Sequence, residues 1–112
     1  MTADDVIRIR HMVDALHSAI SFTRGRQRED LDTDTMLAFA LVRAIEIVGE
    51  AATKVSIDTR EQHPEVPWAA IVGMRHRLIH AYFDINHDIL WTTATNAAPG
   101  LLPRLLAIVS AG

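Results

Sequence analysis

The helical spacing of apolar residues in the first half of the chain is the feature that most constrains the fold. From Asp4 to about Thr23, apolar residues recur three and four positions apart, which places them along one side of a helix. The same spacing returns between about Thr33 and about Ser56. We find no sustained alternation of apolar and polar residues and no Asn-Gly or Asp-Gly turn, the usual signs of strands and hairpins. The sequence therefore predicts an all-α protein.

Residues that favour the ends of helices delimit the first two. Thr2 can cap the first helix, and Gly25 suits its end because glycine accepts the left-handed conformation that often follows a helix. Residues 24–32 are charged and are predicted to form the first connection. Residues 57–66 follow the second helix, and we expect them to form a loop that His63-Pro64 closes.

The second half of the chain predicts three further helices. Pro67 fits the first turn of a third helix, which is expected to carry the whole segment 74–82. Asn86 can cap a fourth helix. The Pro99-Gly100 pair is expected to break or kink that helix, because proline lacks the backbone N–H that a helix uses. A last short helix would then cover residues 101–109.

These lengths predict a four-helix up-and-down bundle with a short extra C-terminal helix. The 112 residues fit a single domain, residues 1–112, with a modest core. Apolar residues widen the stripe of the second helix, so we expect that helix to be buried on more than one side. A homodimer would provide the second covered side. The widening residues are Met36, Ala40, Ile47 and Ala51.

Composition and charge narrow the classes of function. The chain has no cysteine, which excludes disulfides and thiolate metal ligands. No apolar run approaches the roughly 18 residues that cross a membrane, and the acidic start does not resemble a signal peptide, so we expect a cytoplasmic protein that does not enter membranes. The formal net charge of −3 argues against coating of nucleic acid by charge alone. It leaves room for a local basic cleft.

The segment from Met74 to Tyr82 is the best candidate for such a cleft. Arg75 can clamp a phosphate with two parallel hydrogen bonds, and His80 can move a proton near neutral pH. In RNA, the ribose 2′-hydroxyl can attack the adjacent phosphorus, so the nucleophile already belongs to the substrate. Arg75 would stabilise the charged phosphorane, and His80 would accept or donate the proton. This chemistry requires neither a metal nor a cofactor.

Helical geometry sets a difficulty for this interpretation. On a straight helix, with roughly 100° per residue, Arg75 and His80 would lie about 140° apart. Arg75 and Tyr82 would share a side, and so would His76 and His80. Either the helix loosens near His80, or two copies of the chain face each other across a symmetric cleft. We favour the second arrangement, because it also uses the expected homodimer.

A metal site is the main competing interpretation of the two histidines. His76 and His80 have the His-x3-His spacing of a two-histidine site. The glutamate of a His-Glu-x-x-His motif is replaced by Arg77, a cation that would sit next to the metal. We therefore expect no metal here. The residues that could otherwise supply a third ligand are Glu46, Glu50 and His87.

A family resemblance supports the phosphate interpretation. The segment from Arg75 to Tyr82 is similar to the Arg-x4-6-His signature of HEPN domains, in the Arg-x4-His-x-Tyr form of HepT-like proteins. His76 fits the polar residue that often follows the arginine in that superfamily. Residues 42–52 resemble the second-helix signature of the same family, and residues 67–74 resemble the lead-in to its motif helix. The similarity extends over about residues 4–108.

The resemblance implies a HEPN-like helical homodimer with metal-independent ribonuclease activity. It implies that Arg75 and His80 are catalytic and that His76 supports them. It also implies a toxin of a toxin–antitoxin pair, whose partner is an MntA-like nucleotidyltransferase. In such pairs the antitoxin transfers AMP from ATP onto the motif tyrosine, here Tyr82. Phosphates added near Arg75 would satisfy the arginine internally and repel the RNA backbone.

An alternative function stays open at this point. The chain could be a catalytically silent helical module that binds nucleotide or RNA and presents it to a small nucleotidyltransferase. The negative net charge and the unfavourable helical phase of Arg75 and His80 motivate this alternative. The polar side of the second helix also has two possible roles, as a row of surface ion pairs or as a support for Arg75. Its residues are Arg43, Glu46 and Glu50.

Overall fold

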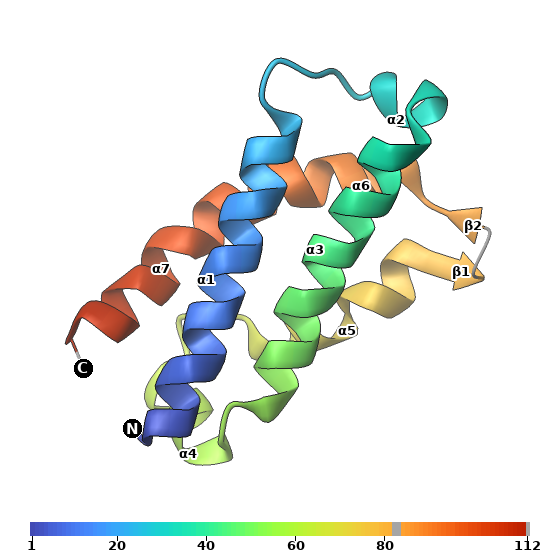
Figure 1. The fold of residues 1–112 in the computed structure, drawn as a ribbon. Coiled ribbons are helices and arrows are strands. Elements are labelled where there is room, and N and C mark those ends of the chain that lie inside the picture. The colour runs from blue at the N-terminus through green and yellow to red at the C-terminus, as the bar shows by residue number, and fades with distance from the viewer. Residues whose placement is uncertain (82–83, 112) are drawn as a thin grey trace.

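The computed structural model describes residues 1–81 and 84–111, with side chains described for residues 1–79 and 84–110. Over these residues the chain is a bundle of helices with one very short two-stranded hairpin. Figure 1 shows two long helices side by side, with the later helices crossing behind them. The all-α, HEPN-like architecture predicted from the helical spacing is confirmed. Among the described residues, no helix combines the length and apolar character that crossing a bilayer requires.

Helices α1 (Ala3–Thr23) and α3 (Thr35–Lys54) run antiparallel and form the centre of the bundle. Thr2 caps α1 as predicted, because its hydroxyl accepts a hydrogen bond from the backbone N–H of Asp5 at 3.1 Å. Gly25 follows the end of α1 with a positive φ of 69°, a conformation that favours glycine. The predicted second helix is confirmed, with each end two residues further in.

Two short helices occupy segments that were predicted as connections. Helix α2 (Asp30–Thr33) lies in the charged segment after α1, and α4 (Ile57–Gln62) replaces the loop expected after α3. Ser56 caps α4 by accepting from the N–H of Thr59 at 3.3 Å. The loop prediction was wrong because a buried carboxylate on α1, that of Asp5, accepts hydrogen bonds from the capping Ser56 and from Thr59 in the first turn of α4. Sequence spacing could not reveal that tertiary contact.

Helix α5 (Trp68–Leu78) begins after Pro67 as predicted but ends before the motif is complete. The backbone is extended over β1 (Ile79–Ala81), which pairs antiparallel with β2 (Asp84–Ile85). The prediction of one helix through residues 74–82, with no strand nearby, was therefore wrong. Leu78 is fully buried, and its carbonyl accepts from the N–H of Asn86 at 2.9 Å instead of from a further helical turn. That bond closes the hairpin and ends the helix.

Helix α6 (His87–Thr92) starts at Asn86, whose side chain accepts from the N–H of Ile89 at 3.0 Å, as predicted. A π-helical turn, η1 (Thr93–Ala97), joins it to α7 (Ala98–Ala111). The break predicted at Pro99-Gly100 was wrong, because helical conformation continues through both residues. The wider π turn ends just before Pro99 and changes the hydrogen-bond pattern where proline has no N–H to donate.

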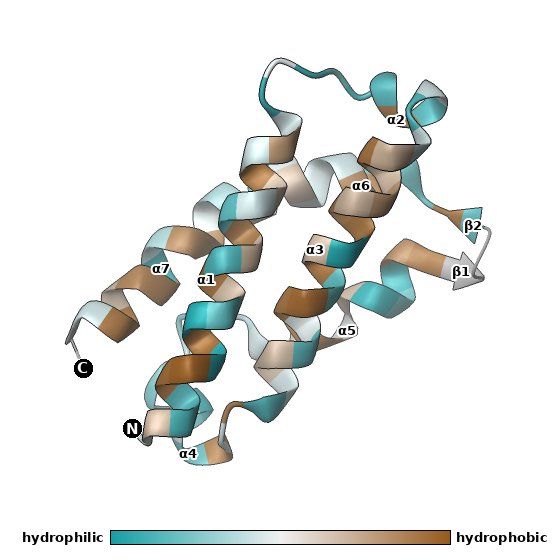
Figure 2. Cartoon of the chain, in the orientation of Figure 1, coloured by the Kyte–Doolittle hydropathy of each residue, from teal (hydrophilic) through white to brown (hydrophobic). Residues whose placement is uncertain are grey.

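The core consists of two apolar clusters along the bundle. One joins α1, the end of α3 and α7, and it includes the fully buried Ile9 and Leu105. The other joins α3, α5 and α6 through the fully buried Leu41, Leu78 and Leu90. Figure 2 shows apolar residues along the length of both long helices. The second cluster lies under the end of α5 and therefore supports the motif segment.

Candidate functional site

The last turn of α5 carries the three basic residues of the motif helix. Arg75, His76 and Arg77 all have exposed side chains there. The next residue, Leu78, is fully buried in the cluster with α3 and α6. A buried residue at the end of the helix fixes its direction, so the three basic side chains project from a firmly held turn.

Arg75 is held by a carboxylate from the neighbouring helix. Its Nε donates a hydrogen bond to Oε2 of Glu46 on α3 at 3.1 Å. The Arg75 side chain is 59% exposed and that of Glu46 only 22%. The two terminal nitrogens of Arg75 have no hydrogen-bond partner among the described residues. They form the end of the guanidinium fork that can bind two phosphate oxygens at once.

A shallow pocket surrounds this contact. Its volume is about 270 Å³, and Arg75 and Glu46 supply its polar wall. Phe39 and Val42 of α3 and two isoleucines of the hairpin, Ile79 and Ile85, supply the apolar walls. Figure 1 shows α5 passing behind α3 and leading into the hairpin. The pocket can hold a charged group against Arg75 and an apolar group beside it.

The other two motif residues lie at the edge of what the structure describes. The backbone of His80 belongs to β1, and its side chain is outside the described residues. Tyr82 is outside them entirely. Because α5 ends at Leu78, the 140° separation expected on a straight helix does not apply to Arg75 and His80. The helix thus loosens before His80, the first of the two arrangements considered. Whether a second chain also completes the cleft stays a prediction.

The polar side of α3 divides into two different contacts. Arg43 and Glu50 form an ion pair of 3.4 Å between side chains that are both more than half exposed, a type that contributes little to stability. Glu46, between them in sequence, turns to Arg75 instead. Both roles that the sequence left open are therefore present, on different residues. His76 has an exposed side chain with no hydrogen bond or ion pair among the described side chains.

Not all of the apolar residues that were expected to widen the buried side of α3 are buried within the single chain. Met36 is 83% exposed, so its expected burial is absent here. Phe39, which sequence reasoning did not select, is 63% exposed and lines the Arg75 pocket. Phe39 lies three residues after Met36, on the same side of the helix, and this spacing could have identified it from the sequence. The start of α3 thus presents large apolar side chains next to the candidate site.

Two further arginines, Arg26 and Arg28 in the segment after α1, are neutralised within the chain. Arg26 pairs with Asp30 and Asp34, and Arg28 pairs with Asp32 at 2.7 Å and with Asp88 at 2.6 Å. Hydrogen bonds from His87 and then from Arg28 lower the pKa of the Asp32 carboxyl. These arginines are therefore poor candidates for phosphate binding.

Two of the residues considered as a third metal ligand have other partners. Nδ1 of His87 lies 2.8 Å from Oδ1 of Asp32, and Glu46 contacts Arg75. Among the side chains that the structure describes, those of residues 1–79 and 84–110, no group of three or more histidine or acidic residues is placed to hold a metal ion.

Comparison with known proteins finds one matching family and several similar proteins. Residues 12–108 match the model of the family described as Ribonuclease HepT-like. A protein of Caldanaerobacter subterraneus subsp. tengcongensis, named as an RNase by inference, is 39% identical over 101 residues, which is 90% of each chain. A protein of Thermococcus cleftensis, named by inference as ribonuclease HepT, is 38% identical over 93 residues, covering 83% of this chain and 84% of the relative.

A third relative extends the similarity to another archaeon. A protein of Methanocaldococcus jannaschii, also named as an RNase by inference, is 35% identical over 88 residues, covering 79% of this chain and 81% of the relative. No solved structure gives a significant match.

Proposed function

Because the chain belongs to the HepT-like ribonuclease family, we propose that it is an endoribonuclease that cuts RNA at Arg75 and His80 without a metal. The observation that carries this proposal is the geometry of Arg75. Glu46 holds its Nε at 3.1 Å, while the end of the guanidinium stays open at the rim of a pocket. An arginine fixed at one side and open at the other is ready to bind a phosphate.

The reaction we propose is an internal transesterification of the RNA. The 2′-oxygen forms a bond to phosphorus and the bond from phosphorus to the 5′-oxygen breaks, which leaves a 2′,3′-cyclic phosphate and a 5′-hydroxyl. One group takes the proton from the 2′-hydroxyl and another gives a proton to the leaving 5′-oxygen. His80 serves in one of these transfers, and His76 is the supporting residue. Arg75 stabilises the extra negative charge on the phosphorane oxygens.

We propose that two copies of the chain form the working cleft. Met36 and Phe39 are large apolar side chains left exposed at the start of α3, and Phe39 borders the Arg75 pocket. Burial of such side chains against a second copy is favourable. A two-fold contact there would bring the two Arg75 pockets close together. Each phosphate could then meet Arg75 of one chain and His80 of the other.

We further propose that the protein is the toxin of a toxin–antitoxin pair. Its partner would be an MntA-like nucleotidyltransferase that transfers AMP to Tyr82. Tyr82 lies seven residues beyond Arg75 in sequence and directly follows β1. A phosphate fixed on that tyrosine would compete with RNA for the open end of Arg75 and would block the pocket by its bulk.

RNA cleavage by purified protein, with divalent metals chelated, tests the central proposal. We expect wild-type protein to cut RNA, and Arg75→Ala and His80→Ala each to lower the rate by about 100-fold or more. Arg43→Ala is the matched control, because Arg43 is an exposed arginine of α3 paired only with Glu50. Binding of RNA without any cleavage would instead favour the silent binding module.

Mass spectrometry tests the proposed regulation. Co-expression with an MntA-like nucleotidyltransferase is expected to add one or more AMP units to the wild-type protein and none to Tyr82→Phe. If the wild-type protein keeps its unmodified mass while its ribonuclease activity is suppressed, then the partner acts by binding and the AMP-transfer proposal is wrong.

A further inference from the structure

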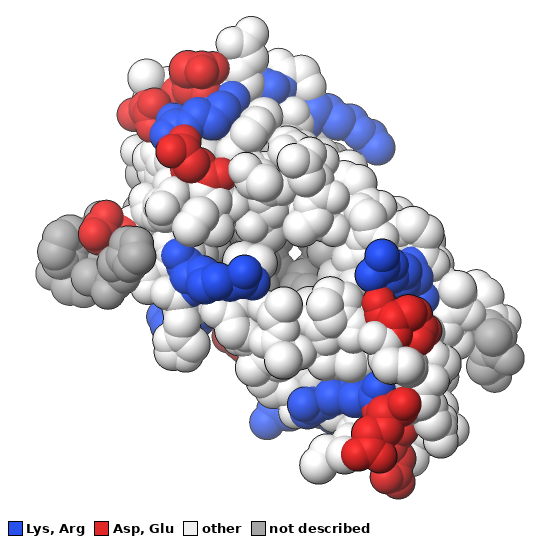
Figure 3. Space-filling view, turned by 180° about the vertical axis from the view of Figure 1, so that it is seen from behind, with Lys and Arg blue, Asp and Glu red and all other residues white. Residues whose placement is uncertain are grey.

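A second pocket lies on the opposite side of α5 from Arg75. Arg75 and Arg77 are two positions apart on the helix, a rotation of roughly 200°, so their side chains leave α5 in nearly opposite directions. The pocket at Arg77 lies between α5 and the α6–η1 segment and has a volume of about 400 Å³. Figure 3 views the molecule from behind and shows a hollow near the centre of that face, with Lys or Arg side chains on either side.

Arg77 is a cation without a carboxylate partner among the described residues. Its Nη2 donates to the backbone carbonyl of Ala70 at 3.1 Å, a contact that directs the side chain but leaves its charge unbalanced. Arg26 and Arg28, in contrast, each pair with two carboxylates. Asp88 also lines the pocket, but its carboxylate is held by Arg28 at 2.6 Å. The pocket therefore favours an anionic ligand at Arg77.

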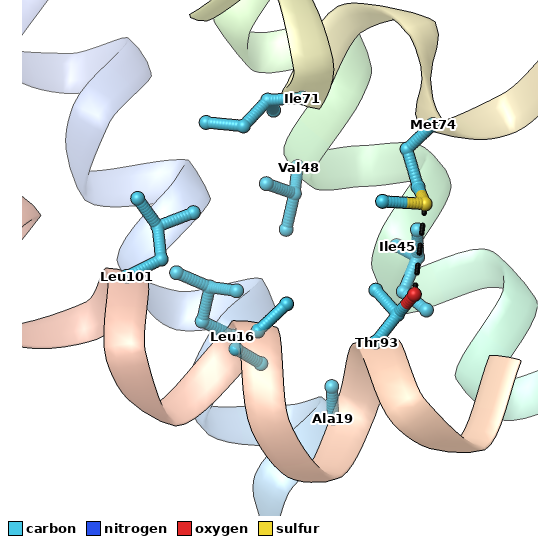
Figure 4. A pocket seen from close by; sticks show the side chains of 10 residues that line it. Leu16, Ala19, Ile45, Val48, Ile71, Met74, Thr93 and Leu101 are labelled. Atoms are coloured by element: carbon cyan, nitrogen blue, oxygen red, sulfur yellow. Dashed lines mark hydrogen bonds between the residues drawn. The ribbon is translucent and has the colours of Figure 1, made fainter. Parts of the chain in front are cut away.

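Thr93 offers the pocket a hydroxyl that has no strong partner. Its Oγ1 donates to Sδ of Met74 at 3.5 Å, the contact drawn as a dashed line in Figure 4. A thioether sulfur is a weak acceptor. A ligand oxygen would be a better acceptor for the Thr93 hydroxyl than this sulfur, because hydrogen bonds to oxygen are shorter and stronger. Thr92, also in the wall of the pocket, has an exposed side chain.

The remaining wall of the pocket is apolar. Met74, Ile89 and Ala97 supply it. Met74, Thr93 and Ala97 also line a smaller apolar cavity of about 60 Å³ inside the bundle, shown in Figure 4. A flat, weakly polar ring could lie against this wall while a charged group reached Arg77. At about 400 Å³ the pocket has the size of a small-molecule site and exceeds what a bare phosphate would fill.

We propose that this pocket binds one nucleotide. Its phosphate would contact Arg77, an oxygen of its sugar or base would accept from Thr93, and its base would lie against Met74, Ile89 and Ala97. The inference rests on the proposed function, since it takes the nucleotide to be one unit of the RNA substrate, bound away from the cut phosphate. A free nucleotide has the same chemistry and is the other possible source.

Equilibrium binding separates this pocket from the cleavage site. The probes are a short RNA with 2′-O-methyl riboses, which cannot undergo the internal attack, and AMP alone. Arg77→Gln is expected to weaken binding of the oligonucleotide by about tenfold, the loss typical of one charge-assisted contact. Arg104→Gln is the matched control, because Arg104 also contacts only a backbone carbonyl, that of Glu65 at 2.8 Å, but does not line the pocket.

A pair of threonine variants tests the hydroxyl. Thr93→Val keeps the shape and removes the donor, so it should weaken oligonucleotide binding several-fold, whereas Thr93→Ser should restore it. Measurable AMP binding that depends on Arg77 would identify free nucleotide as a ligand, and oligonucleotide binding alone would identify RNA. If Arg77→Gln and Arg104→Gln weaken oligonucleotide binding equally, or if neither weakens it, the proposal of a nucleotide pocket is overturned.

The two proposals fail in different ways. If uncut RNA binds in an Arg77-dependent manner but wild-type protein never cleaves RNA, then the nucleotide pocket stands and the ribonuclease proposal falls. If RNA is cleaved while binding of the methylated RNA is indifferent to Arg77, then the catalytic proposal stands and the pocket is overturned.

Discussion

Nε of Arg75 lies 3.1 Å from Oε2 of Glu46, so a residue of α3 sets the position of the arginine at the end of α5. The contact joins the two helices that enclose the candidate pocket. It leaves the outer half of the guanidinium for an anion. A carboxylate beside a phosphate site reduces affinity by repulsion, so the role that fits Glu46 is orientation of the arginine.

Glu46→Gln is expected to lower RNA cleavage by about tenfold, with most of the loss in kcat. The amide keeps the length of the side chain but removes the charge that fixes Arg75, so the arginine would stabilise the transition state less well. Steady-state kinetics on a fluorescent RNA measures the effect. Glu50→Gln, which affects only the exposed pair with Arg43, should leave the rate unchanged. Equal rates for both variants would remove Glu46 from the site.

Phe39→Ser and Met36→Ser are expected to convert a dimer into a monomer. Both side chains are exposed in the single chain, so neither change should cost much folding stability. Light scattering coupled to gel filtration gives the mass, and thermal denaturation reports on the fold. Ile57→Ser removes an equally exposed side chain from α4, at 67%, and should leave the dimer intact. A monomeric wild-type protein would falsify the shared-cleft proposal.

The carboxyl group of Asp5 should make the stability of the fold depend on pH. Burial alone would raise the pKa of its carboxyl, but hydrogen bonds from Thr59 at 2.6 Å and from Ser56 at 2.7 and 2.9 Å outweigh burial and lower the pKa to about 2. A lowered native pKa stabilises the folded state above the unfolded value, near 3.8, and this stabilisation disappears as the pH falls through about 2.

Asp5→Asn should therefore destabilise the protein by about 2 kcal/mol at pH 7, a figure that corresponds to the pKa shift. The difference from wild type should shrink mostly between about pH 4 and about pH 2. Urea denaturation at several pH values measures it. Asp4→Asn is the control, because Asp4 is an exposed neighbour in the same helical turn. A penalty that stayed constant down to pH 2 would show that packing, not charge, is responsible.

The small internal cavity predicts a stabilising substitution. Val48 and Ile71 are among the side chains around this space of about 60 Å³. Val48→Ile adds one methylene that the cavity can accept, and it should stabilise the fold by about 0.5–1 kcal/mol. Val55→Ile adds the same group at a fully buried position that does not line the cavity, and it should destabilise instead. Thermal melting of the two variants in parallel decides the matter, and shifts in the same direction would count against the cavity.

The fold could be predicted from the sequence where local chemistry decides the structure. Thr2 and Asn86 cap their helices through side chains three residues from the N–H that they bind, so the sequence pattern contains the contact. Helix α4 was missed because Asp5, more than fifty residues away in sequence, holds Ser56 and Thr59. The continuation of helix through Pro99 was missed because a π turn upstream changes the bonding pattern.

The candidate site could be predicted only in part for the same reason. The residue types at Arg75 and His80 indicated phosphate chemistry without any structure. The partner of Arg75 could not be chosen between Glu46 and Glu50, because both lie on the polar side of α3 and only the packing angle of α5 decides. The end of α5 at Leu78 was also unpredictable, since the burial of that leucine and the bond from Asn86 are both tertiary.

The end of α5 between Arg75 and His80 has a consequence for how the motif can vary. On a continuous helix, each inserted residue would rotate everything beyond it by roughly 100°. Here the residues after Leu78 belong to a short hairpin, where an added residue can be absorbed as a bulge or a longer turn. A spacing of four to six residues between the arginine and the histidine, as in the HEPN signature, is then geometrically tolerable. The length of this segment is a variable that evolution can change without reorienting the arginine.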